Sequence, residues 1–176
     1  TEYLFFPGIY DLQPEGTGEY VDAQSARAVV EDGAQGSSYE TTHVTLEGSL
    51  NSQLRGEVLR AAQDAVQACG TLGRNADQMC PSALRSSSLS VLDVTTLPST
   101  LMSVSDSGAY TGEDAVITYQ DPGSWLPDRH PRTLTLRPTM TVALSDAGVP
   151  VTDIDGKPVI SVTLSIPSSS GDSPSS

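Results

Sequence analysis

The chain has 176 residues, which predicts one domain, or one domain with a tail, and is long enough to bury a sizeable core. Aromatic residues make up only 5%, so the core has to consist mainly of Val, Leu, Ile and Ala. Acidic residues outnumber basic ones by 22 to 9, which gives a formal net charge of −13. Such a field repels phosphates, so the composition excludes a nucleic-acid partner and disfavours direct adsorption to an anionic membrane.

The first fifty residues predict short strands. Residues 3–10 have the pattern of two strands around a Pro-Gly turn, and Ala26–Val30 and residues 41–46 are further strand candidates. The chain begins at Thr1 and not at a methionine, so we expect a fragment or a processed product. It contains no signal peptide or transmembrane run, so membrane attachment is expected only through a tether outside this sequence.

One segment, Ser52–Cys69, has the periodicity of an amphipathic helix. Its predicted apolar face contains Leu54, Val58, Ala61, Ala65 and Cys69. Polar side chains occupy the opposite face: Gln53, Glu57, Arg60, Asp64 and Gln67. Asn51 or Ser52 can cap the start, and Gly70 can end the helix. The alanines indicate close packing against a sheet.

From Ser88 onward apolar residues recur with a period of two, which indicates strands. Strands are predicted at residues 88–94, 115–119, 134–144 and 160–166, with turn chemistry at residues 145–148 and 155–156. Pro138 interrupts the third of these and indicates a sheet edge or a bulge. The expected fold class is α+β, an antiparallel, mostly β sheet packed by one long helix. A cystatin-like or nuclear-transport-factor-like arrangement would fit.

Residues 1–166 are expected to form a single extracytoplasmic domain. Residues 167–176 are rich in Ser and Pro and have nothing large to bury, which predicts a flexible tail. A cell-wall spacer is the functional alternative for this tail.

The two cysteines, Cys69 and Cys80, stand at the end of the predicted helix and eleven positions later. Neither histidine is near in sequence to complete a metal site, and no C-x-x-C motif is present. A disulfide is therefore the simplest interpretation, with two reduced core cysteines as the alternative. A disulfide would indicate an oxidising compartment, outside the cytoplasm.

A helix that ends in Ala-Cys, a loop of about ten residues and Cys80-Pro81 resemble the extracytoplasmic domains of uncharacterised actinobacterial membrane proteins. The turn at Phe6-Pro7-Gly8-Ile9-Tyr10 is similar to one found upstream in those domains. The resemblance covers residues 4–12 and about 54–81. It implies a membrane-tethered domain that faces outward, and it supplies no catalytic residue.

Few residues are candidates for chemistry. Trp125, between two prolines, is either a loop anchor in the core or a ligand contact. Asp153-Ile154-Asp155-Gly156 resembles part of a calcium loop, but the other acidic ligands are missing, so a hairpin turn is the better interpretation. No catalytic triad, phosphate-binding loop, metal site or cofactor site is indicated.

We therefore expect a non-catalytic module at the cell envelope that binds an unknown protein or envelope partner or shapes the surface. The alternative is a small-ligand-binding or sensor domain with a pocket between helix and sheet. A hydrolase whose carboxylates cannot be identified from sequence is a third hypothesis.

Overall fold

The computed structural model describes residues 8–13, 18–30, 44, 48–71, 79–85, 89, 91–105, 107–120 and 131–167. The chain divides into two compact units, Thr1–Ser52 and Gln53–Ser176. The predicted single domain over residues 1–166 stays a prediction, which the number of unfolding transitions would decide. Residues 168–176 of the predicted tail lie outside the described residues.

The first unit contains two small antiparallel pairs. Strand β1 (Gly8–Leu12) pairs with β3 (Ala26–Val30), and β2 (Val21–Ala23) pairs with β4 (Gly48–Leu50). The strand predicted at Ala26–Val30 is confirmed. Residues 3–7 and most of residues 41–46, where other strands are predicted, lie outside the described residues.

The helix α1 spans Ser52–Cys69, as the sequence predicts. Its N-terminal neighbour Asn51 donates from the side chain to the carbonyl of Glu19, at 2.7 Å. At the other end, the backbone N–H of Gly70 donates to the carbonyls of Val66 and Gln67. The helix therefore begins at Ser52 and ends before Gly70, as expected, but the bond from Asn51 to Glu19 ties the start of the helix to the preceding segment and is not itself a helix cap.

The buried face of α1 differs in one detail from the predicted face. Buried side chains are those of Leu54, Val58, Ala62, Ala65, Val66 and Cys69. Ala61, predicted in this face, is only half-buried, and Ala62 and Val66 take its place. The reason is that the buried stripe follows steps of four residues from Leu54 to Val66, and steps of four drift around a helix of 3.6 residues per turn.

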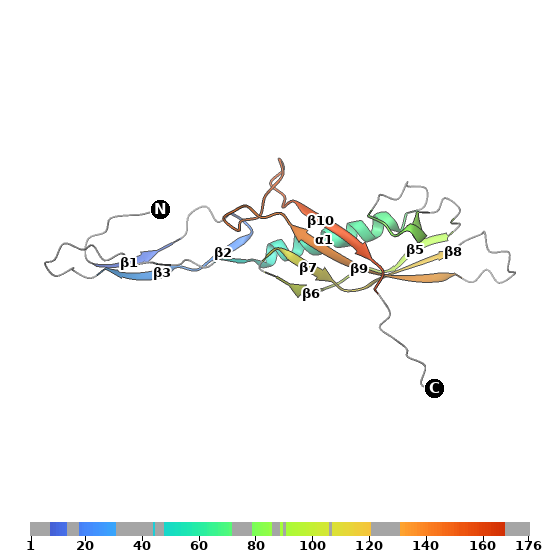
Figure 1. Cartoon of the computed structure of the whole chain (residues 1–176), viewed down its shortest axis with the longest axis horizontal. Helices are drawn as coiled ribbons and strands as arrows, with labels where there is room; N and C mark the ends of the chain where they lie inside the picture. The colour runs from blue at the N-terminus through green and yellow to red at the C-terminus, as the bar shows by residue number, and fades with distance from the viewer. Residues whose placement is uncertain are drawn as a thin grey trace, which may run out of the picture. The chain divides into compact units, whose positions relative to one another are not determined.

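The second unit carries a six-stranded antiparallel sheet with the order β5-β8-β9-β7-β6, and β10 pairs with β9. The strands are β5 (Val91–Thr96), β6 (Leu101–Val104), β7 (Ala109–Gly112), β8 (Ala115–Gln120), β9 (Arg132–Val142) and β10 (Ile160–Ser165). β7 and β8 pair with successive parts of β9, so they form one long, interrupted strand beside it. Helix α1 lies behind β9 and β10 in Figure 1, so it covers one face of the sheet. The fold is α+β, as predicted.

The strand predictions hold for β8 and β10 and are shifted by a few residues for β5. The predicted interruption at Arg137-Pro138 is wrong, because β9 runs without a break from Arg132 to Val142. The irregularity lies instead in the neighbouring strand, which is interrupted between β7 and β8, opposite Pro138. A proline has no N–H to donate, and a bulge in its partner is one of the few places where a sheet accommodates it.

The core between α1 and the sheet is closely packed. One cluster of buried residues joins the helix end, the cysteine bridge and three strands: Ala65, Val66, Cys69, Cys80, Leu84, Ala115, Ile117, Leu136 and Leu164. Cys69 and Cys80 form a disulfide, with a Cα–Cα distance of 5.6 Å. It joins the end of α1 to the short 3-10 helix η1 (Ser82–Leu84), whose Leu84 is also in the core.

Two small hairpins connect β9 to β10. In each, a glycine with positive φ, Gly148 or Gly156, closes a turn by donating to the carbonyl three residues earlier. The hairpins meet in a ring of backbone hydrogen bonds, in which Ala143 donates to Val159, Val159 to Val151 and Val151 to Ala143. Asp153 Oδ1 accepts from the N–H groups of Asp155 and Lys157, at 2.9 Å each. This carboxylate is therefore a turn acceptor.

Candidate binding surface

The face of the sheet opposite α1 is lined mainly by hydroxyl side chains. Along β9, the buried residues Leu136, Pro138, Met140 and Val142 alternate with polar ones that point away from the helix. The register continues this side onto β10, β7 and β8, where it carries further hydroxyl side chains together with the apolar Ala109 and Val116. We call it the hydroxyl face, and its members are Thr111, Thr118, Thr133, Thr135, Thr139, Thr141, Ser161, Thr163 and Ser165.

Strand register places the hydroxyl groups in rows. Thr139 lies opposite Thr163 on one side and opposite Thr111 on the other, and Thr111 lies opposite Ser103 of β6. A second row joins Thr141 with Ser161. Because residues directly opposite in an antiparallel sheet lie on the same face, the first row crosses β6, β7, β9 and β10, and the second joins β9 and β10. The result is a broad surface of groups that both donate and accept hydrogen bonds.

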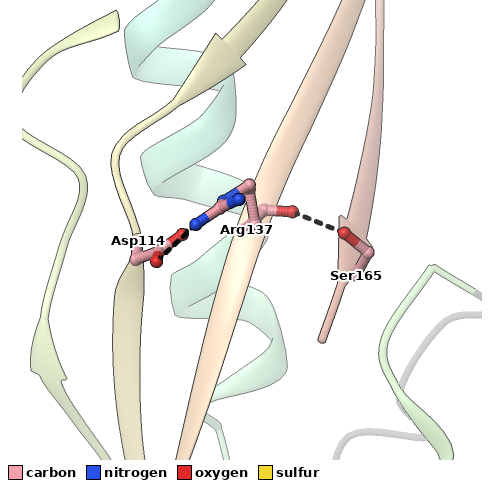
Figure 2. A network of polar contacts seen from close by, with 3 residues as sticks. All are labelled: Asp114, Arg137 and Ser165. Carbon is pink, nitrogen blue, oxygen red and sulfur yellow. Dashed lines mark hydrogen bonds and ion pairs between the residues drawn. The ribbon is translucent and has the colours of Figure 1, made fainter. Parts of the chain in front are cut away.

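An ion pair lies in the middle of the hydroxyl face. Asp114 stands in the interruption between β7 and β8, and Arg137 stands on β9 (Figure 2). Arg137 Nε donates to Asp114 Oδ1 at 2.7 Å, and Nη2 donates to Oδ2 at 2.9 Å. The side chain of Asp114 is 34% exposed and that of Arg137 is 39% exposed. This two-pronged geometry orients both groups and leaves them within reach of a ligand.

The ion pair shifts the pKa values of both Asp114 and Arg137. Hydrogen bonds from Arg137 lower the pKa of Asp114, although partial desolvation opposes them. The same bonds raise the pKa of Arg137. Both groups are thus charged and mutually neutralised at neutral pH. On the next strand, Ser165 Oγ donates to the carbonyl of Arg137 at 3.3 Å (Figure 2).

The neighbouring Glu113 makes hydrogen bonds within the fold. Ser99 Oγ donates to Glu113 Oε2 at 2.7 Å, and the backbone N–H of Glu113 donates to the carbonyl of Thr100 at 3.0 Å. The hydrogen bonds from Ser99 lower the pKa of Glu113. Glu113 therefore anchors the segment between β5 and β6 to the interruption between β7 and β8.

The structure brings together one pair of the predicted site residues, Cys69 and Cys80. Trp125, the candidate ligand contact, lies outside the described residues. Sequence reasoning did not find the Asp114–Arg137 pair, whose members are 23 positions apart. One signal could have located the interruption between β7 and β8. The buried residues are at even positions in β7, Tyr110 and Gly112, and at odd positions in β8, Ala115 and Ile117, so the period of two is broken between them.

Within the described part of the chain, no group of three or more His, Cys, Asp or Glu side chains is placed to hold a metal ion. The same residues include no helix with the length and hydrophobicity of a membrane span.

Comparisons of the chain with protein-family models, with curated proteins and with solved structures gave no match.

Proposed function

We propose that this chain is a non-catalytic, extracytoplasmic module of the cell envelope that binds an uncharged, hydroxyl-rich glycan through the hydroxyl face. The observation that carries the proposal is the exposure of this face on a sheet whose other side is covered by α1. Hydroxyl groups in register offer repeated donors and acceptors, which suit a polymer with repeated hydroxyls.

Charge supports the choice of ligand. The chain carries a net charge of −13, so a polyanionic partner would be repelled. On the hydroxyl face the central charges, Asp114 and Arg137, neutralise each other. An uncharged polymer can therefore approach this face without an electrostatic cost.

The disulfide between Cys69 and Cys80 supports a location outside the cytoplasm, because such bonds persist in oxidising compartments. The helix–sheet interface supports a binding surface over an internal ligand site, because side chains from both layers, among them Val66, Ile117 and Leu136, are fully buried there.

Co-sedimentation with an insoluble, uncharged glycan such as cellulose or chitin tests the proposal. The chain should pellet with the polymer, and Thr139→Asp, in the middle of the hydroxyl face, should reduce the bound fraction severalfold. Thr152→Asp is the matched control, since Thr152 is an exposed threonine in the connection between β9 and β10. If the chain stays in the supernatant, or if both variants bind like the parent chain, this proposal is wrong.

A further inference from the structure

The two edges of the six-stranded sheet differ in how they are protected. On the β5–β6 side the edge is interrupted: Pro98 lies between the strands, and the register shifts within both pairings, at Val94/Thr96 and at Leu101/Ser103. Gln63 of α1 donates to the carbonyl of Pro98 at 2.9 Å, which holds this break in place. Prolines, bulges and charges are the devices that prevent unwanted strand pairing at an edge.

The β10 edge has none of these devices. Its register against β9 is regular from Ile160 to Ser165. No charged residue stands between Pro158 and Pro167. Within the described part of the chain, β10 pairs with β9 alone, so its outer edge presents unpaired backbone groups. Ile166, directly after the strand, is a large apolar side chain with 53% of its surface exposed.

We propose that β10 pairs with β10 of a second copy of this chain, antiparallel and centred on Thr163, so that two sheets join into one. This inference goes beyond the proposed function and does not depend on it.

The sequence of β10 is self-complementary about this centre. On the hydroxyl face, Thr163 would lie opposite Thr163 of the other copy, and Ser161 opposite Ser165. On the helix side, Val162 would lie opposite Leu164, and Ile160 opposite the exposed Ile166. Every position thus meets a residue of its own kind, which is the condition for a two-fold symmetric interface.

Electrostatics also favour this edge for a second copy. Each copy carries a net charge of −13, so most surfaces of two copies repel each other. The β10 edge is free of charge over its whole length. Because directly opposite residues share one side of a sheet, the hydroxyl faces of the two copies would become continuous.

Sedimentation equilibrium of the 176-residue chain, at concentrations up to about 1 mM, tests the proposal. The parent chain should show a reversible monomer–dimer equilibrium. Thr163→Lys places two like charges opposite each other and should weaken the dimer by at least about fivefold. Ser103→Lys, an exposed position on the β6 edge, makes the same change in net charge and should leave the dimer intact.

A mixture of Thr163→Lys and Thr163→Glu chains tests the register. Each variant alone should dimerise at least about fivefold more weakly than the parent chain. The equimolar mixture should dimerise, because the lysine introduced in one chain would meet the glutamate introduced in the other. A parent chain that is monomeric throughout would overturn the proposal. So would equal weakening by the two lysine variants, or a mixture that dimerises no better than its components.

Discussion

Gly56 lies within α1 and Gly70 directly follows it, and the two differ in the space that is available for a side chain. A Cβ built at Gly56 would meet nothing within 4 Å. A Cβ at Gly70 would collide with the side chain of Val94 on β5. Gly70 therefore permits the close approach of the helix end to the sheet, whereas Gly56 contributes only backbone freedom.

The two glycines predict mutations of opposite sign. Gly56→Ala should stabilise the protein by about 0.5–1 kcal/mol, because alanine is the better helix former. Gly70→Ala should destabilise it by about 1–3 kcal/mol through overpacking. Urea unfolding of both variants checks the pair, and a stabilising Gly70→Ala would contradict the packing of α1 against β5.

Asp114 predicts a pH-dependent contribution to stability. Because its pKa is lowered in the folded state, its ion pair with Arg137 stabilises the fold above the unfolded value of about 3.9. The contribution is lost as the pH falls through the lowered folded value. Since both groups are partly exposed, it should be about 1 kcal/mol or less.

The measurement is urea unfolding of the parent chain and Asp114→Asn at pH 7 and at pH 2. The variant should be less stable at pH 7, and the difference should shrink as the pH is lowered and Asp114 of the folded parent chain becomes protonated. Asp93→Asn is the control, because Asp93 is exposed on β5 and has no ion pair among the described residues. A difference for Asp114→Asn that is the same at both pH values would exclude the ion pair as its cause.

At the scale of elements, the phase of α1 decides which side chains the fold depends on. Val58 is 0% exposed, whereas its neighbour Glu57 pairs with Arg60 at the surface, at 2.9 Å. Val58→Asp would bury a carboxylate without a partner, which costs several kcal/mol. Glu57→Ala loses only a surface pair and should cost less than about 0.5 kcal/mol. Denaturant unfolding in which Glu57→Ala proved the more damaging would show that the phase is wrong.

The disulfide links two elements and predicts a difference between the oxidised and reduced chains. Thiol titration of the unfolded, unreduced protein should find no free thiol, because both cysteines are bonded. Replacing both cysteines by alanine should lower stability by about 3 kcal/mol, since the bond closes a loop of eleven positions. Two titratable thiols per chain would remove the bond and the compartment argument with it.

The elements differ in how well the sequence predicts them, for physical reasons. Helix α1 combines a long apolar period with capping residues and a terminal glycine, so local sequence fixes its bounds. β2 and β4 span three residues each, which is too short for a period to show. The Asp114–Arg137 pair depends on register between β9 and an interrupted strand, which is a long-range property. The hydroxyl face follows from the period-two pattern once one side of each strand is assigned to the core.

At the scale of the whole molecule, the net charge of −13 predicts that the chain does not bind nucleic acids. Duplex DNA or RNA should not bind at physiological salt, because affinity for phosphates depends on basic side chains. A fluorescence titration with labelled duplex checks this expectation. Sub-micromolar binding would mean that the arginines, which are eight of the nine basic residues, gather on one surface.

The order of the strands has a consequence for how the molecule folds. Segment 91–104 pairs with segment 109–120, segment 109–120 with β9, and β9 with β10, so every pairing joins stretches that follow each other in the chain. Because each pairing closes a loop between adjacent stretches, the loop entropy lost before its contacts form is smaller than for strands drawn from distant parts of the chain. The sheet can therefore form by adding hairpins in chain order. β10, the last strand of the sheet in the sequence, would then pair with a β9 that is already hydrogen-bonded to β7 and β8.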